Sequence, residues 1–72
     1  MYFIAYKDQD GNDFNGLPWI EEIVEGDQSL TAARNRKSVY ENVFTSIVIF
    51  ECDENNIPEE ITWDFVNEHK VE

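Results

Sequence analysis

The fold depends on one stretch of sequence, FTSIVIFE at residues 44–51. This is an uninterrupted run of β-branched and aromatic residues, which is typical of a strand that is buried on both faces. We therefore predict a strand over residues 44–51 and expect it to lie at the centre of a sheet. The segments on either side should then supply its neighbouring strands and the helices that cover them.

A helix is predicted directly before this strand, over residues 29–43. Asp27 or Ser29 can cap it by accepting a hydrogen bond from a free N–H group of the first turn. The residues that recur at spacings of three and four, as on one face of a helix, are Leu30, Ala33, Lys37, Tyr40 and Phe44.

Two further strands are predicted in the N-terminal part, over residues 2–8 and 19–25. The first is rich in aromatic residues and ends at turn-forming residues, and the second follows Pro18 and precedes Gly26. Asp10 and Gly11 could supply the two positive φ values of a primed hairpin turn between them. Residues 12–17 then resemble a loop.

A last helix is predicted over residues 58–70. Asn55 or Asn56 can cap it, and Pro58 suits its first position because the missing N–H costs nothing there. The order strand, strand, helix, strand, helix predicts an α+β fold, a small three-stranded antiparallel or mixed sheet packed with one or two helices. Residues 1–72 are expected to form a single compact acidic domain. One edge of the sheet should stay exposed, so the protein is expected to be a monomer or a homodimer.

The charge of the chain limits its partners. Sixteen Asp and Glu against five Lys and Arg give a net charge of −11, which disfavours direct binding to nucleic acid or to an anionic membrane. Cys52 is the single cysteine, so no internal disulfide can form, and we expect a reducing, cytoplasmic setting. The apolar start ends at Lys7 and is too short for a targeting or membrane segment.

Few residues suit catalysis. Cys52 and His69 are the only Cys and His, so a nucleophilic pair would need the last turn to fold back beside the strand end. Adjacent acidic pairs such as Glu21-Glu22 point in different directions. Residues 8–13 superficially resemble a calcium loop, but their glycine is misplaced and a polar turn is the favoured interpretation, with weak divalent binding as the alternative. We expect no enzyme activity, no cofactor and no metal.

One group of acidic residues has a regular spacing that the acidic composition alone does not require. Glu60, Asp64, Glu68 and Glu72 recur every four residues, so on a helix they would form one acidic stripe beside an apolar face. Such a stripe advances ~6 Å per charge, whereas a DNA strand presents a phosphate every ~3.4 Å. Mimicry of nucleic acid would therefore need a second row. Candidates for that row are Glu51, Asp53 and Glu54, or Glu21, Glu22, Glu25 and Asp27.

Two interpretations of the charge pattern stay open. The stripe is either a solvated face or a recognition surface for a basic groove. The basic group Arg34, Arg36 and Lys37 either pairs with surrounding acids or forms a small contact for phosphate or carboxylate. Outside residues 29–43, fifteen acids and two lysines give a charge of −13, so the charge is segregated along the chain.

The function expected from these features is non-catalytic binding, by an acidic surface, to a basic protein that handles nucleic acid. In size, charge and lack of catalytic groups the chain resembles small inhibitors encoded by phages, including anti-CRISPR proteins and DNA mimics. The resemblance is one of class, and no motif carries it. Two alternatives are a small adaptor or host-modulating factor that binds through an aromatic patch or an exposed sheet edge, and an enzyme based on clustered carboxylates.

Overall fold

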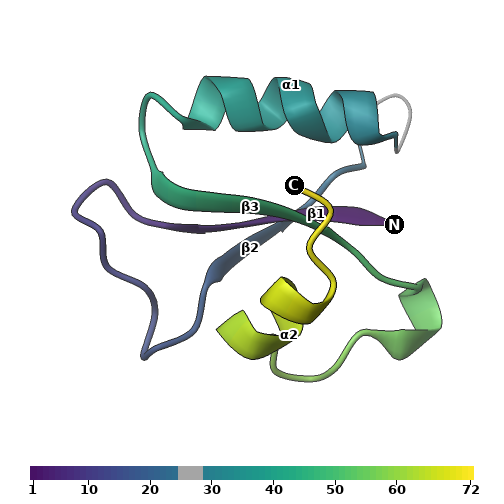
Figure 1. Cartoon of the computed structure of the whole chain (residues 1–72). Helices are drawn as coiled ribbons and strands as arrows, with labels where there is room; N and C mark the ends of the chain where they lie inside the picture. Colours follow the sequence, from purple (N-terminus) through teal and green to yellow (C-terminus); the bar gives the residue numbers. More distant parts are fainter. Residues whose placement is uncertain (25–28) are drawn as a thin grey trace.

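The computed structural model describes residues 1–24 and 29–72, and its elements follow the predicted order (Figure 1). Three strands form one sheet: β1 (Tyr2–Lys7), β2 (Trp19–Glu22) and β3 (Thr45–Glu51). Two helices, α1 (Leu30–Tyr40) and α2 (Trp63–Glu68), and a short 3₁₀ helix, η1 (Glu54–Asn56), complete the chain. The α+β fold in the order β-β-α-β-α is therefore confirmed. Glu25 and Asp27 lie outside the described residues.

The sheet has the strand order β2-β1-β3, and β1 is antiparallel to both neighbours. Our expectation that β3 lies at the centre is wrong, because β1 holds that place. Phe3, Ile4 and Ala5 in β1 are 4%, 0% and 0% exposed. β3 is buried on both faces only in its second half, and its first residues, Thr45 and Ser46, are exposed.

The two helices cover opposite faces of the sheet, so the molecule has three layers (Figure 1). Ala33 of α1 packs with Ile4 and Ile49 on one face. Val66 of α2 packs with Phe3 and Phe50 on the other face. The alternation of side chains along β1 and β3 thus supplies both layers with a core.

Hydrogen bonds alternate between the two neighbours of β1. Ile23 N donates to Tyr2 O at 3.0 Å on the β2 side, and Cys52 N donates to Met1 O at 3.1 Å on the β3 side. In an antiparallel ladder this alternation leaves every second residue of an edge strand with outward backbone groups. From the register, those residues are Ile20 and Glu22 in β2, and Ile47, Ile49 and Glu51 in β3.

The C-terminal segment, residues 69–72, closes much of the outer edge of β3. Ile49 N donates to Glu72 O and Val71 N donates to Ile49 O, both at 2.8 Å. Glu51 N donates to His69 O at 3.2 Å. The apolar pattern of β3 has a different cause, because its side chains pack into a core on each face of the sheet although a full strand lies on only one side of it.

The first turn differs from the predicted primed hairpin. The carboxylate of Asp8 accepts hydrogen bonds from the backbone N–H groups of Asp10 and Asn12, both at 2.9 Å, and Gly11 has a φ of 80°. Asp10 does not have positive φ, since Asn15 and Ser46 are the only non-glycine residues with positive φ in the described part of the chain. The turn is therefore built on the Asp8 side chain.

A primed turn does form a few residues later, where we expected a loop. Phe14 and Leu17 exchange two backbone hydrogen bonds of 2.8 Å across Asn15 and Gly16, whose φ values are 52° and 80°. An Asn-Gly pair is the strongest short-range signal for such a turn. The signal at Asn15 and Gly16 is thus present in the sequence, although we expected a loop there.

Both helices are capped by hydroxyl groups. Ser29 Oγ accepts from Ala32 N at 3.2 Å and begins α1, as predicted. Thr62 Oγ1 accepts from Phe65 N at 3.1 Å and begins α2, so the predicted last helix exists but is shorter than the expected residues 58–70. Asn56, one of the two predicted caps, instead lies at the end of η1 and donates its side-chain amide to the Asp53 carboxylate at 3.3 Å. The Thr62 cap thus fixes a shorter helix that starts five residues after Pro58.

Matched isoleucine substitutions test the placement of the core. Ile49 is fully buried and Ile57 is 37% exposed. Ile49→Val is expected to lower the free energy of unfolding by about 0.5–1.5 kcal/mol, because it removes a buried methylene group. Ile57→Val should change it by less than about 0.5 kcal/mol. Urea denaturation of both variants measures the difference, and equal losses would contradict the described core.

Candidate protein-binding surface

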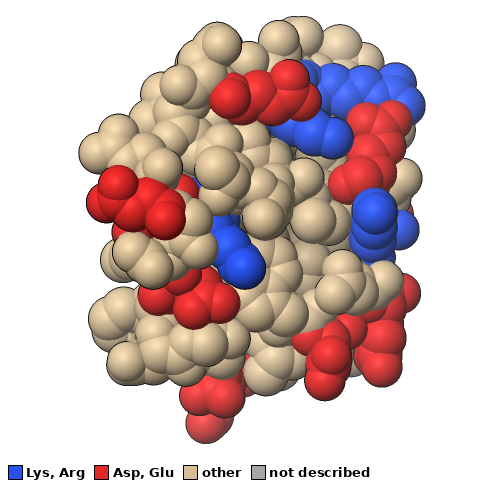
Figure 2. Space-filling view, turned by 60° about the vertical axis from the view of Figure 1, so that its left-hand side comes forward, with Lys and Arg blue, Asp and Glu red and all other residues tan. Residues whose placement is uncertain are grey.

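Acidic residues dominate the segment between β3 and the end of α2. Residues 51–68 contain seven Asp and Glu and no Lys or Arg, and all seven acids are exposed. They are Glu51, Asp53, Glu54, Glu59, Glu60, Asp64 and Glu68. In the view of Figure 2, the lower part of the molecule carries only acidic charges, whereas Lys and Arg lie in the upper and middle parts. We call these seven residues the acidic segment.

The predicted helical stripe is wrong as a geometric unit. α2 contains Asp64 and Glu68, but Glu60 lies before its cap and Glu72 lies after its end. Glu72 is engaged with the α1 layer, where its carboxylate forms an ion pair with Arg34. The structure therefore leaves a single pair of acids four residues apart on this helix.

The proposed second row comes from the end of β3 and from η1. Glu51 is the last residue of β3, Asp53 precedes η1, and Glu54 begins it. All three are exposed, and among the described residues none forms an ion pair. Their role in binding a partner stays a prediction.

Two of the three basic residues on α1 form ion pairs. Arg34 pairs with Glu72, and Arg36 pairs with Glu21 of β2. The hydroxyl of Tyr40 also donates to Glu21, which raises the pKa of Tyr40. Of the two interpretations of the basic group, the structure therefore supports pairing with surrounding acids for Arg34 and Arg36. Seven of the described acids that form no ion pair with α1 make up the acidic segment.

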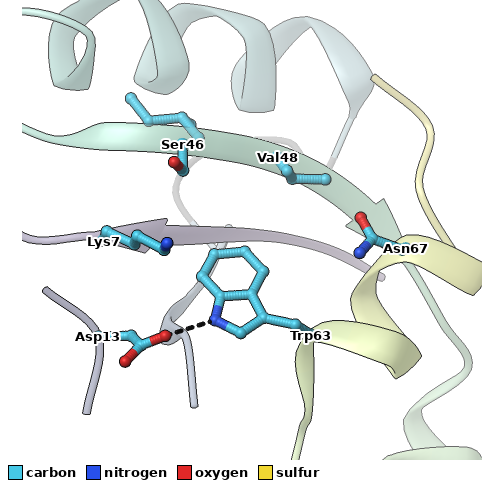
Figure 3. Close-up of a pocket in the computed structure, with 7 residues that line it drawn as sticks. Lys7, Asp13, Ser46, Val48, Trp63 and Asn67 are labelled. Atoms are coloured by element: carbon cyan, nitrogen blue, oxygen red, sulfur yellow. Dashed lines mark hydrogen bonds between the residues drawn. The ribbon is translucent and has the colours of Figure 1, made fainter. Parts of the chain in front are cut away.

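A pocket of about 340 Å³ lies where α2 meets the first half of β3 (Figure 3). Trp63 spans it, with its indole Nε1 donating to Asp13 at 3.0 Å and the Lys7 ammonium 5.9 Å from the ring centre. Ser46 and Asn67 complete its polar lining. The carboxylate of Asp13 is the only one in the lining, and it also accepts from Gly16 N at 3.2 Å. These contacts hold the Asp13 loop against α2.

The contacts in the loop at residues 8–13 favour a polar turn over an ion site. The carboxylates of Asp8 and Asp13 both accept hydrogen bonds from the protein. Within residues 1–24 and 29–72, no three His, Cys, Asp or Glu side chains gather in a way that could hold a metal ion.

Cys52 and His69 line one shallow pocket, although they are far apart in the sequence. The Cys52 thiol is buried, and burial raises its pKa, as do the nearby carboxylates of Asp53 and Glu51. The His69 ring stacks on Phe65 at 4.1 Å, and its Nδ1 lies 2.9 Å from the Phe65 carbonyl oxygen. A raised thiol pKa opposes the thiolate form that nucleophilic catalysis requires.

The aromatic residues do not form one exposed patch. Tyr2, Tyr6 and Trp63 are half-buried, and the Tyr6 ring stacks on Phe44 at 4.3 Å. Trp19 is 42% exposed and lies beside Phe14, which is 57% exposed, with 5.6 Å between the ring centres. Phe14 also lines an open groove of about 470 Å³ between β2 and the segment that leads to α2. Sequence reasoning missed this groove, because its two sides are about 40 residues apart in the chain.

The described part of the chain has no helix that is long and apolar enough to cross a bilayer. Comparison with protein-family models, with curated proteins and with solved structures gives no match.

Acidification is expected to release residues 69–72 from β3. The hydrogen bond from Arg34 holds the pKa of Glu72 below its ordinary value of 4.5. A lowered folded pKa stabilises the protein above the unfolded value, and this contribution is lost as the pH falls through the folded pKa. Protection of the Ile49 and Val71 amides from hydrogen exchange should therefore drop below about pH 4.5.

Two variants separate this ion pair from general acid unfolding. Glu72→Gln should lower the protection of these amides already at neutral pH and flatten its dependence on pH. Glu68→Gln, which changes an exposed acid on α2, should behave like the unmodified protein. An unchanged pH profile in Glu72→Gln would contradict the assignment.

Proposed function

We propose that this protein is a non-catalytic binding protein that presents its acidic segment to a basic protein that handles nucleic acid. The observation that carries the proposal is the acidic segment itself, seven exposed acids without a Lys or Arg among them. A surface of one charge attracts a partner of the other charge and repels nucleic acid and anionic membranes.

The position of the basic residues supports this proposal. Arg34 and Arg36 of α1 form ion pairs with Glu72 and Glu21, and neither of these acids belongs to the acidic segment. These two arginines therefore do not neutralise the exposed acids of residues 51–68, whose negative charge can act on a partner through solvent. Such a field speeds encounter with a basic partner and makes the complex sensitive to salt.

The arrangement of the acids suits attraction of a basic surface better than imitation of successive phosphates. α2 carries one acidic pair instead of a long stripe, so no single row has the charge spacing of a DNA strand. The remaining acids come from a strand end, from η1 and from the extended chain before α2. We therefore infer that the protein covers the nucleic-acid site of its partner as a charged body, in the manner of an inhibitor.

The absence of catalysis is part of the proposal. The Cys52 thiol has a raised pKa and Asp13 is held by Trp63, so neither group is free for nucleophilic or general-base chemistry. Asp13 lines the described pocket at α2, and Cys52 lines the one at the end of β3.

Charge-matched variants test the proposal once affinity purification and mass spectrometry have identified the partner. Asp64→Asn with Glu68→Gln removes two charges from the acidic segment, and Asp10→Asn with Glu41→Gln removes two exposed charges elsewhere. The first variant should weaken binding about two- to thirtyfold, because each exposed charge contributes ~0.2–1 kcal/mol. The control variant should bind within about twofold of the unmodified protein.

Two further measurements complete the test. Binding of the unmodified protein should weaken steeply between low and moderate salt, and nucleic acid should displace it from the partner in a competition titration. Equal affinities for both double variants, or binding that ignores salt, would overturn the proposal.

A further inference from the structure

We propose that the open edge of β2, with the groove beside it, binds an extended segment of the basic partner in which an apolar side chain is flanked by Lys or Arg. This inference rests on the proposed function and names how the partner is held. Three observations support it: the unpaired edge, the apolar groove and the acids at its rim.

The edge of β2 offers backbone hydrogen bonds. The register leaves the N–H and C=O groups of Ile20 and Glu22 on the side away from β1. Among the described residues, no loop or other strand donates to these groups or accepts from them. An added strand would therefore find a ready template.

The other edge of the sheet is less suitable. The C-terminal segment already pairs with Ile49 and Glu51 on the outer edge of β3. The remaining open part of this edge is irregular. Ser46 has a φ of 54°, and the register with β1 shifts between Ala5 and Lys7 opposite it. The fold thus closes one edge with an extended segment of its own and leaves the same mode of pairing open at β2.

The groove supplies an apolar contact next to that edge. Ile20 forms one wall with Phe14, and Ile57 and Ile61 from the segment before α2 form the opposite wall. Phe14 and Ile57 are 57% and 37% exposed, so a side chain placed between them would cover apolar surface that now faces water.

The charges around the groove specify the rest of the partner segment. Glu59 and Glu60 line it, and no Lys or Arg does. Glu22, two residues after Ile20, points to the same face of the sheet. In an antiparallel pairing, a residue opposite Ile20 would reach the groove and the residue two positions away would face Glu22. An apolar residue with Lys or Arg two positions on either side fits this surface.

A synthetic peptide tests the inference on the full chain. The probe is Lys-Ser-Lys-Ser-Ile-Ser-Lys-Ser-Lys with blocked ends, and its matched control has Ser in place of the central Ile. The probe should bind about tenfold more tightly than the control, because only the probe places an apolar side chain in the groove. In NMR spectra of the labelled protein, the Ile20 and Glu22 amides should shift and gain protection from exchange on binding.

Matched variants locate the site. Phe14→Ser should remove the preference for the probe over the control peptide, whereas Val39→Ser, which changes an exposed apolar residue on α1, should preserve it. Equal affinities of the two peptides, or shifts confined to residues 51–54, would overturn the inference and leave the proposed function standing. If neither peptide binds at low salt, the proposed function fails as well.

Discussion

Strand β1 lies between two antiparallel neighbours and is buried on both faces, and the remaining elements are arranged around this constraint. Its odd-numbered residues bond to β3 and its even-numbered residues bond to β2, so no backbone group of its middle is left for another partner. Phe3 and Ala5 direct their side chains to the α2 layer, while Ile4 directs its side chain to the α1 layer. A chain of 72 residues obtains two half-cores in this way, each closed by one helix.

The same constraint determines where charge can lie. Both faces of the sheet are covered, and the exposed acids among the described residues lie on the helices, the loops and the strand ends. On the α1 side, Glu21 of β2 reaches Arg36 and Tyr40 across the layer boundary. On the α2 side the helix and its approach contain no cation, and the acids there face solvent. The segregation of charge along the sequence thus becomes a difference between α1, which carries three basic residues, and the stretch from η1 to the end of α2, which carries none.

Most of the fold could be predicted from local signals, and the errors came partly from contacts distant in the sequence and partly from local turns and caps that were assigned to the wrong residues. The strand at residues 44–51 and the Ser29 cap depend on near neighbours; the strand was predicted to within a residue, and Ser29 was one of the two predicted caps. The central place of β1 could not be predicted, because β1 and β3 both pack side chains into the cores on the two faces of the sheet and so share the pattern of a buried strand. The acidic stripe failed because Thr62, and not Asn55 or Asn56, caps α2. The groove could not be predicted, because Phe14 and Ile57 line it together only once the segment before α2 has packed beside β2.

The open edge of β2 also bears on association between copies. An exposed strand edge invites pairing with an identical edge, and natural proteins limit this by short strands and charges. β2 has four residues, of which two are Glu21 and Glu22. Pairing of two copies through β2 would bring Glu22 of each near the other and would join two bodies of net charge −11. A basic segment meets no such repulsion, so the same edge discriminates against a second copy and in favour of a partner of opposite charge.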